Sequence, residues 1–210
     1  RIGQFAERLS AAEPLAQMLQ ALDESADLPQ QAELTELFQH LKPAALGTIF
    51  GWLLRLQNPK IVALVEQAAE RLAAANTGEL MALISSNDRV VAREAIRRAG
   101  AMRAAAAVVP LAKVLNDGEV SLRQAAAQAL IEIGSAGAMQ ALERSIEDPD
   151  RDVRVAAVRA LGAKSHRGVL GRLESYVKGK AVREANLTEK MAYFEAYGAM
   201  CGDSGVPYLD

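Results

Sequence analysis

The sequence predicts an all-α fold, a right-handed α-solenoid of stacked antiparallel helix pairs. Residues 116–147 read as two short helices joined by a glycine-containing turn. The flanking sequence repeats this pattern at an interval of 31 residues, and a fixed period of this length is the signature of a solenoid. Half of the chain is apolar but only 4% is aromatic, so we expect a core of aliphatic side chains and alanine.

The clearest repeat carries one apolar stripe on each of its two helices. The apolar residues of each stripe are spaced so that they share one face of a helix. The first stripe is Leu122, Ala126, Ala129 and Leu130, and the second is Met139, Leu142 and Ile146. Glycines at 134 and 137 break the chain between the two helices, because glycine adopts the backbone angles of tight turns. Two helices of this size cannot bury both stripes alone, so stacking on neighbouring copies is required.

An acidic residue precedes each first helix at the same phase of the repeat, as Asp88, Glu119 and Asp150. We expect each carboxylate to accept hydrogen bonds from free backbone N–H groups and to favour the positive end of the helix. An arginine follows four residues after two of these acids, as Arg123 and Arg154.

The N-terminal part of the chain has weaker helix patterns that pair off as degenerate repeats. We expect helices over 2–22 with a restart near Pro14, over 31–41, from Pro43 to about Leu56, over 59–76, and over 77–84 with Thr77 as its cap. Trp52 is expected to be a core anchor, and an exposed binding aromatic is the alternative.

The last repeat departs from the period. Ala196-Tyr197-Gly198 follows Ala160-Leu161-Gly162 by 36 residues, so about five extra residues enter near 178–186. The four tyrosines lie here or just before, at Tyr176, Tyr193, Tyr197 and Tyr208. We expect them to fill a larger terminal unit, and a partner-binding aromatic patch is the alternative.

The segment Asp150-Arg-Asp-Val-Arg-Val-Ala-Ala-Val-Arg-Ala-Leu-Gly162 resembles the HEAT-like repeats first named from phycobilisome lyases. Residues 107–111 and 202–209 resemble the turn and second-helix opening of that family. The resemblance is strong over 87–210 and faint over 30–86. It implies that Arg123 and Arg154, together with the acids four residues before them, Glu119 and Asp150, form a ladder between neighbouring units.

We therefore expect one continuous solenoid domain. Residues 1–86 would form degenerate helical repeats, followed by HEAT-like repeats at 87–115, 116–147, 148–180 and 181–210, the last with an insertion and a truncated end. The chain starts at Arg1 and stops near the expected start of a second helix, so we expect a fragment of a larger protein.

The charge distribution gives no general attraction to nucleic acid or acidic membranes, because the net charge is −2. Residues 86–180 carry a balance of +5, which we interpret as a mixed solvated face, with a basic stripe for an acidic partner as the alternative. The single Cys201 excludes an internal disulfide and favours a reducing compartment, the cytoplasm. No apolar run is long enough to cross a membrane.

The sequence offers no recognisable catalytic or metal-binding motif, and we expect no enzyme activity, metal or cofactor. His40 and His166 lack cysteine or histidine partners at metal-ligand spacing, and His166 is expected in a solvated turn. Asp148, Asp150 and Asp152 lack the glycine and distal glutamate of an EF-hand, so we expect turn and capping roles.

The favoured function is a protein-interaction scaffold that holds a protein or peptide partner on its concave face, to which second helices contribute polar positions. These positions are Lys113, Asn116, Gln140, Glu143, Arg144, Glu147, Arg172 and Glu174. The alternatives are a DNA-binding or DNA-glycosylase-like HEAT enzyme, a chromophore-lyase-like subunit, and a purely structural segment that positions another domain, with a homodimer as one form of it. A glycosylase needs aromatics to hold an exposed base, and residues 86–180 contain one tyrosine and no tryptophan or phenylalanine.

Overall fold

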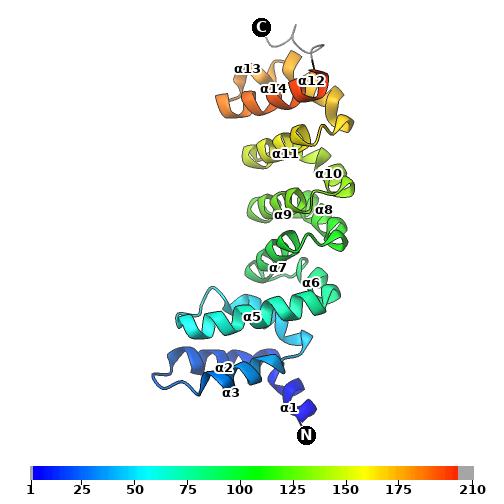
Figure 1. Ribbon diagram of the computed structural model, residues 1–210. Coiled ribbons are helices and arrows are strands. Elements are labelled where there is room, and N and C mark those ends of the chain that lie inside the picture. The colour runs from blue at the N-terminus through cyan, green and yellow to red at the C-terminus, as the bar shows by residue number, and fades with distance from the viewer. Residues whose placement is uncertain (1, 203–210) are drawn as a thin grey trace. The chain divides into compact units, whose positions relative to one another are not determined.

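A computed structural model describes residues 2–202 of the chain (Figure 1). All regular elements within this range are helices, which confirms the predicted all-α class and the helix-pair repeat of an α-solenoid. The chain divides into two compact units, Arg1–Ala99 and Gly100–Asp210. The predicted repeat boundaries at 86/87, 115, 147 and 180 were drawn from the sequence repeat and not from compactness. They remain a prediction.

Unit 1 contains the weaker repeats. Its elements are α1 (Ile2–Leu9), α2 (Ala12–Glu24), α3 (Gln31–Gln39), η1 (Pro43–Ala45), α4 (Leu46–Trp52), α5 (Pro59–Ala75), α6 (Thr77–Leu83) and most of α7 (Arg89–Ala101). The predicted restart near Pro14 is confirmed, since α2 begins two residues before it. Pro59 opens α5, where a missing N–H is tolerated, and the Asn58 side chain accepts a hydrogen bond from the Lys60 N–H at 3.1 Å.

Two expectations in unit 1 are wrong. Trp52 is half-buried at the end of α4, with the Arg55 guanidinium 5.8 Å from its ring centroid, and the fully buried aromatic is Phe50. Thr77 is the first residue of α6 rather than its cap, because Asn76 holds the cap position. Helix phase alone does not decide either detail. The first depends on where α4 ends, and the second depends on where α6 begins.

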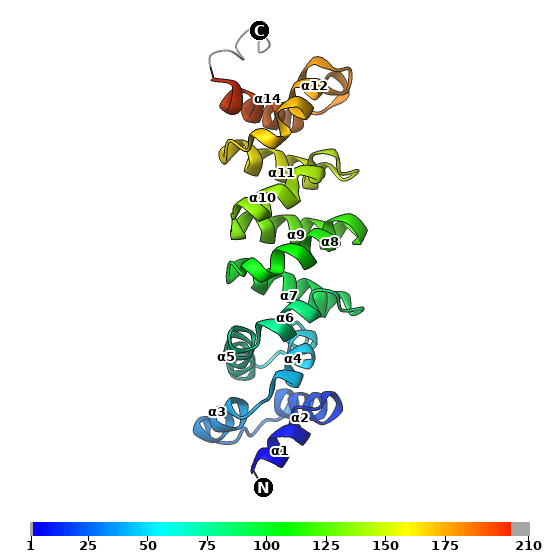
Figure 2. The same cartoon turned by 90° about the vertical axis from the view of Figure 1, so that its right-hand side faces the viewer.

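Unit 2 contains the regular repeats. Its elements are η2 (Ala105–Ala107), α8 (Val108–Asp117), α9 (Val120–Ile133), α10 (Ala136–Leu142), η3 (Glu143–Glu147), α11 (Arg151–Ala163), η4 (Arg167–Val169), α12 (Leu170–Lys178), α13 (Ala181–Glu184) and α14 (Leu187–Cys201). The first helices α9 and α11 pack side by side, and α8 and α10 contact α9 (Figure 1). The second helix α12 contacts the last first helix, α14 (Figure 2). The short helix α13 lies within the predicted insertion.

The apolar stripes of unit 2 face its interior as predicted. Leu111, Leu142 and Leu173 occupy the same phase of three successive second helices, and none has exposed surface. Glycine sets the closeness of the first helices. A Cβ on Gly100 would lie 2.8 Å from the Ala129 Cα, and one on Gly162 would lie 2.8 Å from the Ala196 Cα. Any larger residue at either glycine would push neighbouring first helices apart.

Four described residues of unit 2 have positive φ angles, and three of them follow one another at an interval of 31 residues. These three are Arg103 (φ 50°), Gly134 (φ 62°) and Ser165 (φ 48°), and each lies just after a first helix. The left-handed conformation closes the helix and turns the chain into the next element. Glycine adopts it without steric penalty, whereas arginine and serine do not.

Replacing Gly134 by alanine is expected to destabilise unit 2 by about 1 kcal/mol, because a Cβ is unfavourable in this conformation. Ser165→Gly is the converse change, and we expect a smaller stabilisation since glycine also gains freedom in the unfolded chain. Urea unfolding followed by circular dichroism measures both effects. An unchanged midpoint for Gly134→Ala would contradict the prediction.

An arginine ladder between neighbouring repeats is present, but the acids that bind the arginines are not the predicted Glu119 and Asp150. Arg123 forms a two-pronged ion pair with Asp148, at 2.9 and 3.0 Å, and Arg154 does the same with Glu189, at 2.8 and 3.1 Å. Each arginine therefore binds an acid that comes later in the sequence. Both acids are buried, and a buried carboxylate requires such a partner.

The capping prediction is confirmed for two of the three acids. The Asp88 carboxylate accepts from the Val90 N–H at 2.9 Å, and Asp150 accepts from the Val153 N–H at 3.1 Å. This hydrogen bond from Val153, followed by that from Gln124, lowers the pKa of Asp150. Glu119 is the exception: its side chain does not cap α9 and accepts from the Ser121 hydroxyl at 2.7 Å.

Two of the described tyrosines, Tyr193 and Tyr197, are buried on α14, and Tyr176 on α12 is half-buried. Tyr176 stacks on Tyr193, with ring centroids 3.6 Å apart, and the Tyr193 hydroxyl donates to the Ile146 carbonyl at 2.5 Å. Burial raises the pKa of Tyr193 well above its ordinary value. Tyr208 and the predicted second-helix opening at 203–209 lie outside the described residues.

Candidate functional site

The eight polar positions predicted for partner binding all lie on the second helices of unit 2, a set of side chains that we call the second-helix surface. They are Lys113 and Asn116 on α8, Gln140 on α10, Glu143, Arg144 and Glu147 on η3, and Arg172 and Glu174 on α12. Five are exposed, and Glu143, Arg172 and Glu174 are half-buried. They face outward because the apolar residues of the same helices turn inward at helical spacing.

The structure brings two of these residues together around a third that the sequence did not suggest. Glu143 Oε2 lies 3.0 Å from Arg172 Nη2, and the Arg172 Nη1 donates to the Glu143 carbonyl at 2.9 Å. Glu143 Oε1 lies 2.8 Å from His166 Nε2. His166 is therefore held by Glu143, and the expectation of a freely solvated turn is wrong. These three side chains, the Glu143 cluster, join η3 to η4 and α12.

A glycine leaves room for this cluster. A Cβ on Gly168 would lie 2.5 Å from Glu143 Oε1 and 3.0 Å from His166 Nε2. Gly168 follows Gly137 by one period, but a Cβ on Gly137 would lie 3.9 Å from its nearest neighbour, in ordinary contact. The repeated glycine therefore marks the turn in the sequence, and it does not reveal the close approach of Glu143 to Gly168.

The other members of the second-helix surface do not join the Glu143 cluster. Glu174 pairs with Lys178 one turn along α12, at 2.5 Å. Within residues 2–202, no hydrogen bond or ion pair fixes the side chains of Lys113, Asn116, Gln140, Arg144 and Glu147. The surface thus combines the Glu143–Arg172 pair with polar groups of both charges that have no such partner among the described residues.

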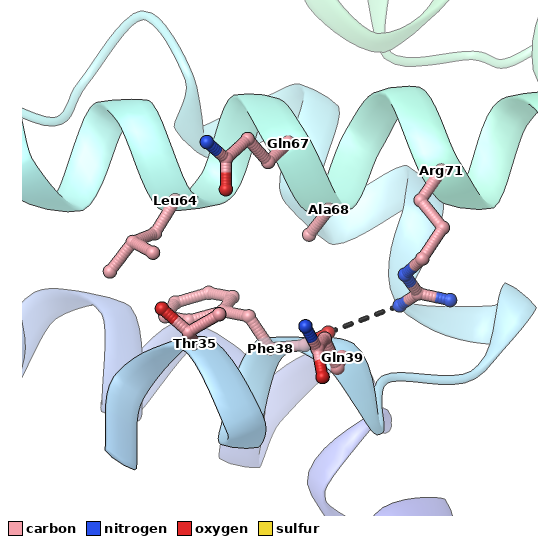
Figure 3. A pocket seen from close by; sticks show the side chains of 7 residues that line it. All are labelled: Thr35, Phe38, Gln39, Leu64, Gln67, Ala68 and Arg71. Atoms are coloured by element: carbon pink, nitrogen blue, oxygen red, sulfur yellow. Dashed lines mark hydrogen bonds between the residues drawn. The ribbon is translucent and has the colours of Figure 1, made fainter. Parts of the chain in front are cut away.

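Unit 1 contains a small groove between α3 and α5 (Figure 3). Its volume is about 130 Å³, and it is lined by Thr35, Phe38, Gln39, Leu64, Gln67, Ala68 and Arg71. The Arg71 guanidinium donates to the Phe38 carbonyl at 3.1 Å and therefore closes the C-terminal end of α3. The groove is smaller than the several hundred Å³ of ordinary small-molecule sites, so one apolar side chain would fill it.

Metal-ligand clusters and membrane-spanning helices are both absent from the part of the chain that the structure describes. No three histidine, cysteine, aspartate or glutamate side chains group there as metal ligands. None of the described helices has the length and hydropathy needed to cross a membrane.

Comparisons with known proteins support the repeat assignment. Residues 77–162 match the family described as HEAT repeats, a range that runs from α6 to α11. The crystal structure of an engineered protein is similar in fold, with a TM-score of 0.52 and 17% identity, covering 95% of this chain and 96% of that one. No curated protein matches the sequence. Residues 77–162 are therefore similar to HEAT repeats, which agrees with the resemblance seen in the sequence.

Proposed function

We propose that this chain is a non-catalytic protein-interaction scaffold that binds a protein or peptide partner on the second-helix surface. HEAT repeats typically serve as protein-interaction scaffolds, and the matched range includes α8 and α10. The single Cys201 supports placement in a reducing compartment, for which we propose the cytoplasm.

The observation that carries the proposal is the arrangement of charge on this surface. Glu143 and Arg172 hold each other in place, which reduces the entropy that binding would otherwise cost. On the same set of second helices, Lys113 and Arg144 offer exposed cations, and Glu147 offers an exposed anion. A partner with complementary charges would gain both specificity and a faster association rate.

The test is a double charge reversal, Lys113→Glu with Arg144→Glu. We expect the variant to capture about tenfold less partner protein than the unmodified chain, because favourable pairs become repulsive. The chain is immobilised, incubated with an extract of its source cells and washed, and the bound proteins are quantified by mass spectrometry.

A matched control reverses two exposed arginines of α11, Arg151→Glu with Arg159→Glu, and changes the net charge equally. We expect this control to retain the captured proteins. Equal retention by both variants would contradict the assignment to the second-helix surface. Binding of a labelled DNA duplex that is lost in the Lys113/Arg144 variant would replace the scaffold proposal with the nucleic-acid alternative.

A further inference from the structure

The last first helix, α14, is apolar on two opposite sides. One side carries Ala192, Ala196 and Met200, which are buried, and α14 contacts both α11 and α12. The other side carries Leu187 and Met191, which are 73% and 48% exposed. A surface helix ordinarily presents polar residues on its solvent side. The second apolar side of α14 is therefore a candidate interface.

The residues of this exposed side follow the spacing of a coiled-coil seam. Intervals of four, three, four and three residues separate Leu187, Met191, Phe194, Gly198 and Cys201. This pattern places Met191 and Gly198 at the a positions and the other three at d positions. Phe194, Gly198 and Cys201 are half-buried. We call these five residues the α14 seam.

The preceding first helix shows how the same side is used within unit 2. The 36-residue offset aligns Met191 with Val155 and Gly198 with Gly162. In α11, Val155 is only 9% exposed, and Gly162 lies against Ala196 of α14. The seam thus has the form of a stacking surface, yet Met191 remains about half exposed.

We propose that the α14 seam binds the α14 seam of a second copy of this chain, in parallel and related by a two-fold axis. The flanking charges decide the orientation. Lys190 and Glu195 occupy the g and e positions, five residues apart, and a parallel pair places each g residue beside the e residue of the other helix. The interface therefore gains two Lys190–Glu195 pairs.

An antiparallel arrangement is disfavoured by the same charges. It would place g positions beside g positions and e positions beside e positions, so lysine would face lysine and glutamate would face glutamate. Gly198 also suits the parallel dimer, because a glycine at an a position lets the two backbones approach closely, as Gly162 and Ala196 do within unit 2. The contact is isologous, which is the commonest form of homodimer.

Sedimentation equilibrium of the whole chain provides the primary test. We expect a concentration-dependent dimer, and Met191→Lys should weaken it by about a hundredfold because two lysines would enter the apolar seam. Val109→Lys is the control, since Val109 is 78% exposed on α8 and lies outside the seam. A chain that is monomeric at every concentration, or a dimer that survives Met191→Lys, would overturn the proposal.

A charge exchange tests the orientation. Lys190→Glu and Glu195→Lys should each weaken the dimer by about tenfold, and the double variant should restore it. Circular dichroism confirms that each variant is folded. If the double variant dimerises no better than the single variants, the Lys190–Glu195 pairs do not exist and the parallel arrangement is wrong.

The single cysteine gives an independent readout. Cys201 occupies the last d position of the seam, so a parallel dimer brings the two Cys201 thiols close to the two-fold axis. A short bismaleimide should cross-link the two copies efficiently, and Met191→Lys should abolish the product. Dimers that sediment normally but give no cross-link would show that a different face mediates assembly.

Discussion

Leu142→Asp is expected to unfold unit 2. Leu142 has no exposed surface and lies at the end of α10, in the middle of the repeat array. An aspartate there would place a charge among apolar side chains with no partner, at a cost of several kcal/mol. We expect the thermal midpoint of unit 2 to fall by at least about 10 °C, measured by circular dichroism and calorimetry.

The control for this change lies two residues earlier on the same helix. Gln140 is exposed, so Gln140→Asp introduces the same residue without burying it. We expect a midpoint within a few degrees of the unmodified chain. If Leu142→Asp melted like Gln140→Asp, the inward phase of α10 would be wrong.

Arg123→Ala is expected to have the second-largest effect. The Asp148 side chain is only 6% exposed, and Arg123 binds both of its carboxylate oxygens. Removing the guanidinium leaves a buried carboxylate without its counter-charge, which we expect to cost about 3 kcal/mol. Urea unfolding would show this loss as a lower midpoint. The urea midpoint of Arg123→Lys should fall between those of the unmodified chain and Arg123→Ala. A lysine keeps the positive charge but cannot form the two-pronged pair.

An exposed ion pair of the same kind provides the comparison. Arg151 and Asp152 lie 2.9 Å apart, but their side chains are 54% and 63% exposed. Such pairs contribute about 0–1 kcal/mol, so Arg151→Ala should leave the midpoint nearly unchanged. Equal losses for Arg123→Ala and Arg151→Ala would indicate that burial of Asp148 does not determine the energetics of the ladder.

Local periodicity was sufficient to predict the core of unit 2. The spacing of apolar residues along each helix places Leu111, Leu142 and Leu173 inside without knowledge of any neighbour, because helix geometry alone decides which positions share a face. The break before Pro14 and the opening of α5 at Pro59 are also local effects of a missing N–H.

Details that depend on tertiary contacts could not be predicted in the same way. The exposure of Trp52 depends on where α4 ends, and Glu119 prefers the Ser121 hydroxyl to the helix N–H groups. The Glu143 cluster joins residues 23 and 29 positions apart in the sequence. Helix phase identified the exposed positions of the second-helix surface, but only folded coordinates reveal which of them bind one another.

The arginine ladder has a consequence for the cooperativity of unit 2. Asp148 accepts from Arg123 through its carboxylate and from Arg154 through its main-chain carbonyl, so one short connection is tied to two first helices at once. Opening of either repeat would leave an ionised group of its neighbour without a counter-ion. Local unfolding of one repeat therefore also destabilises its neighbour. Adjacent repeats should open and close together instead of unfolding one by one.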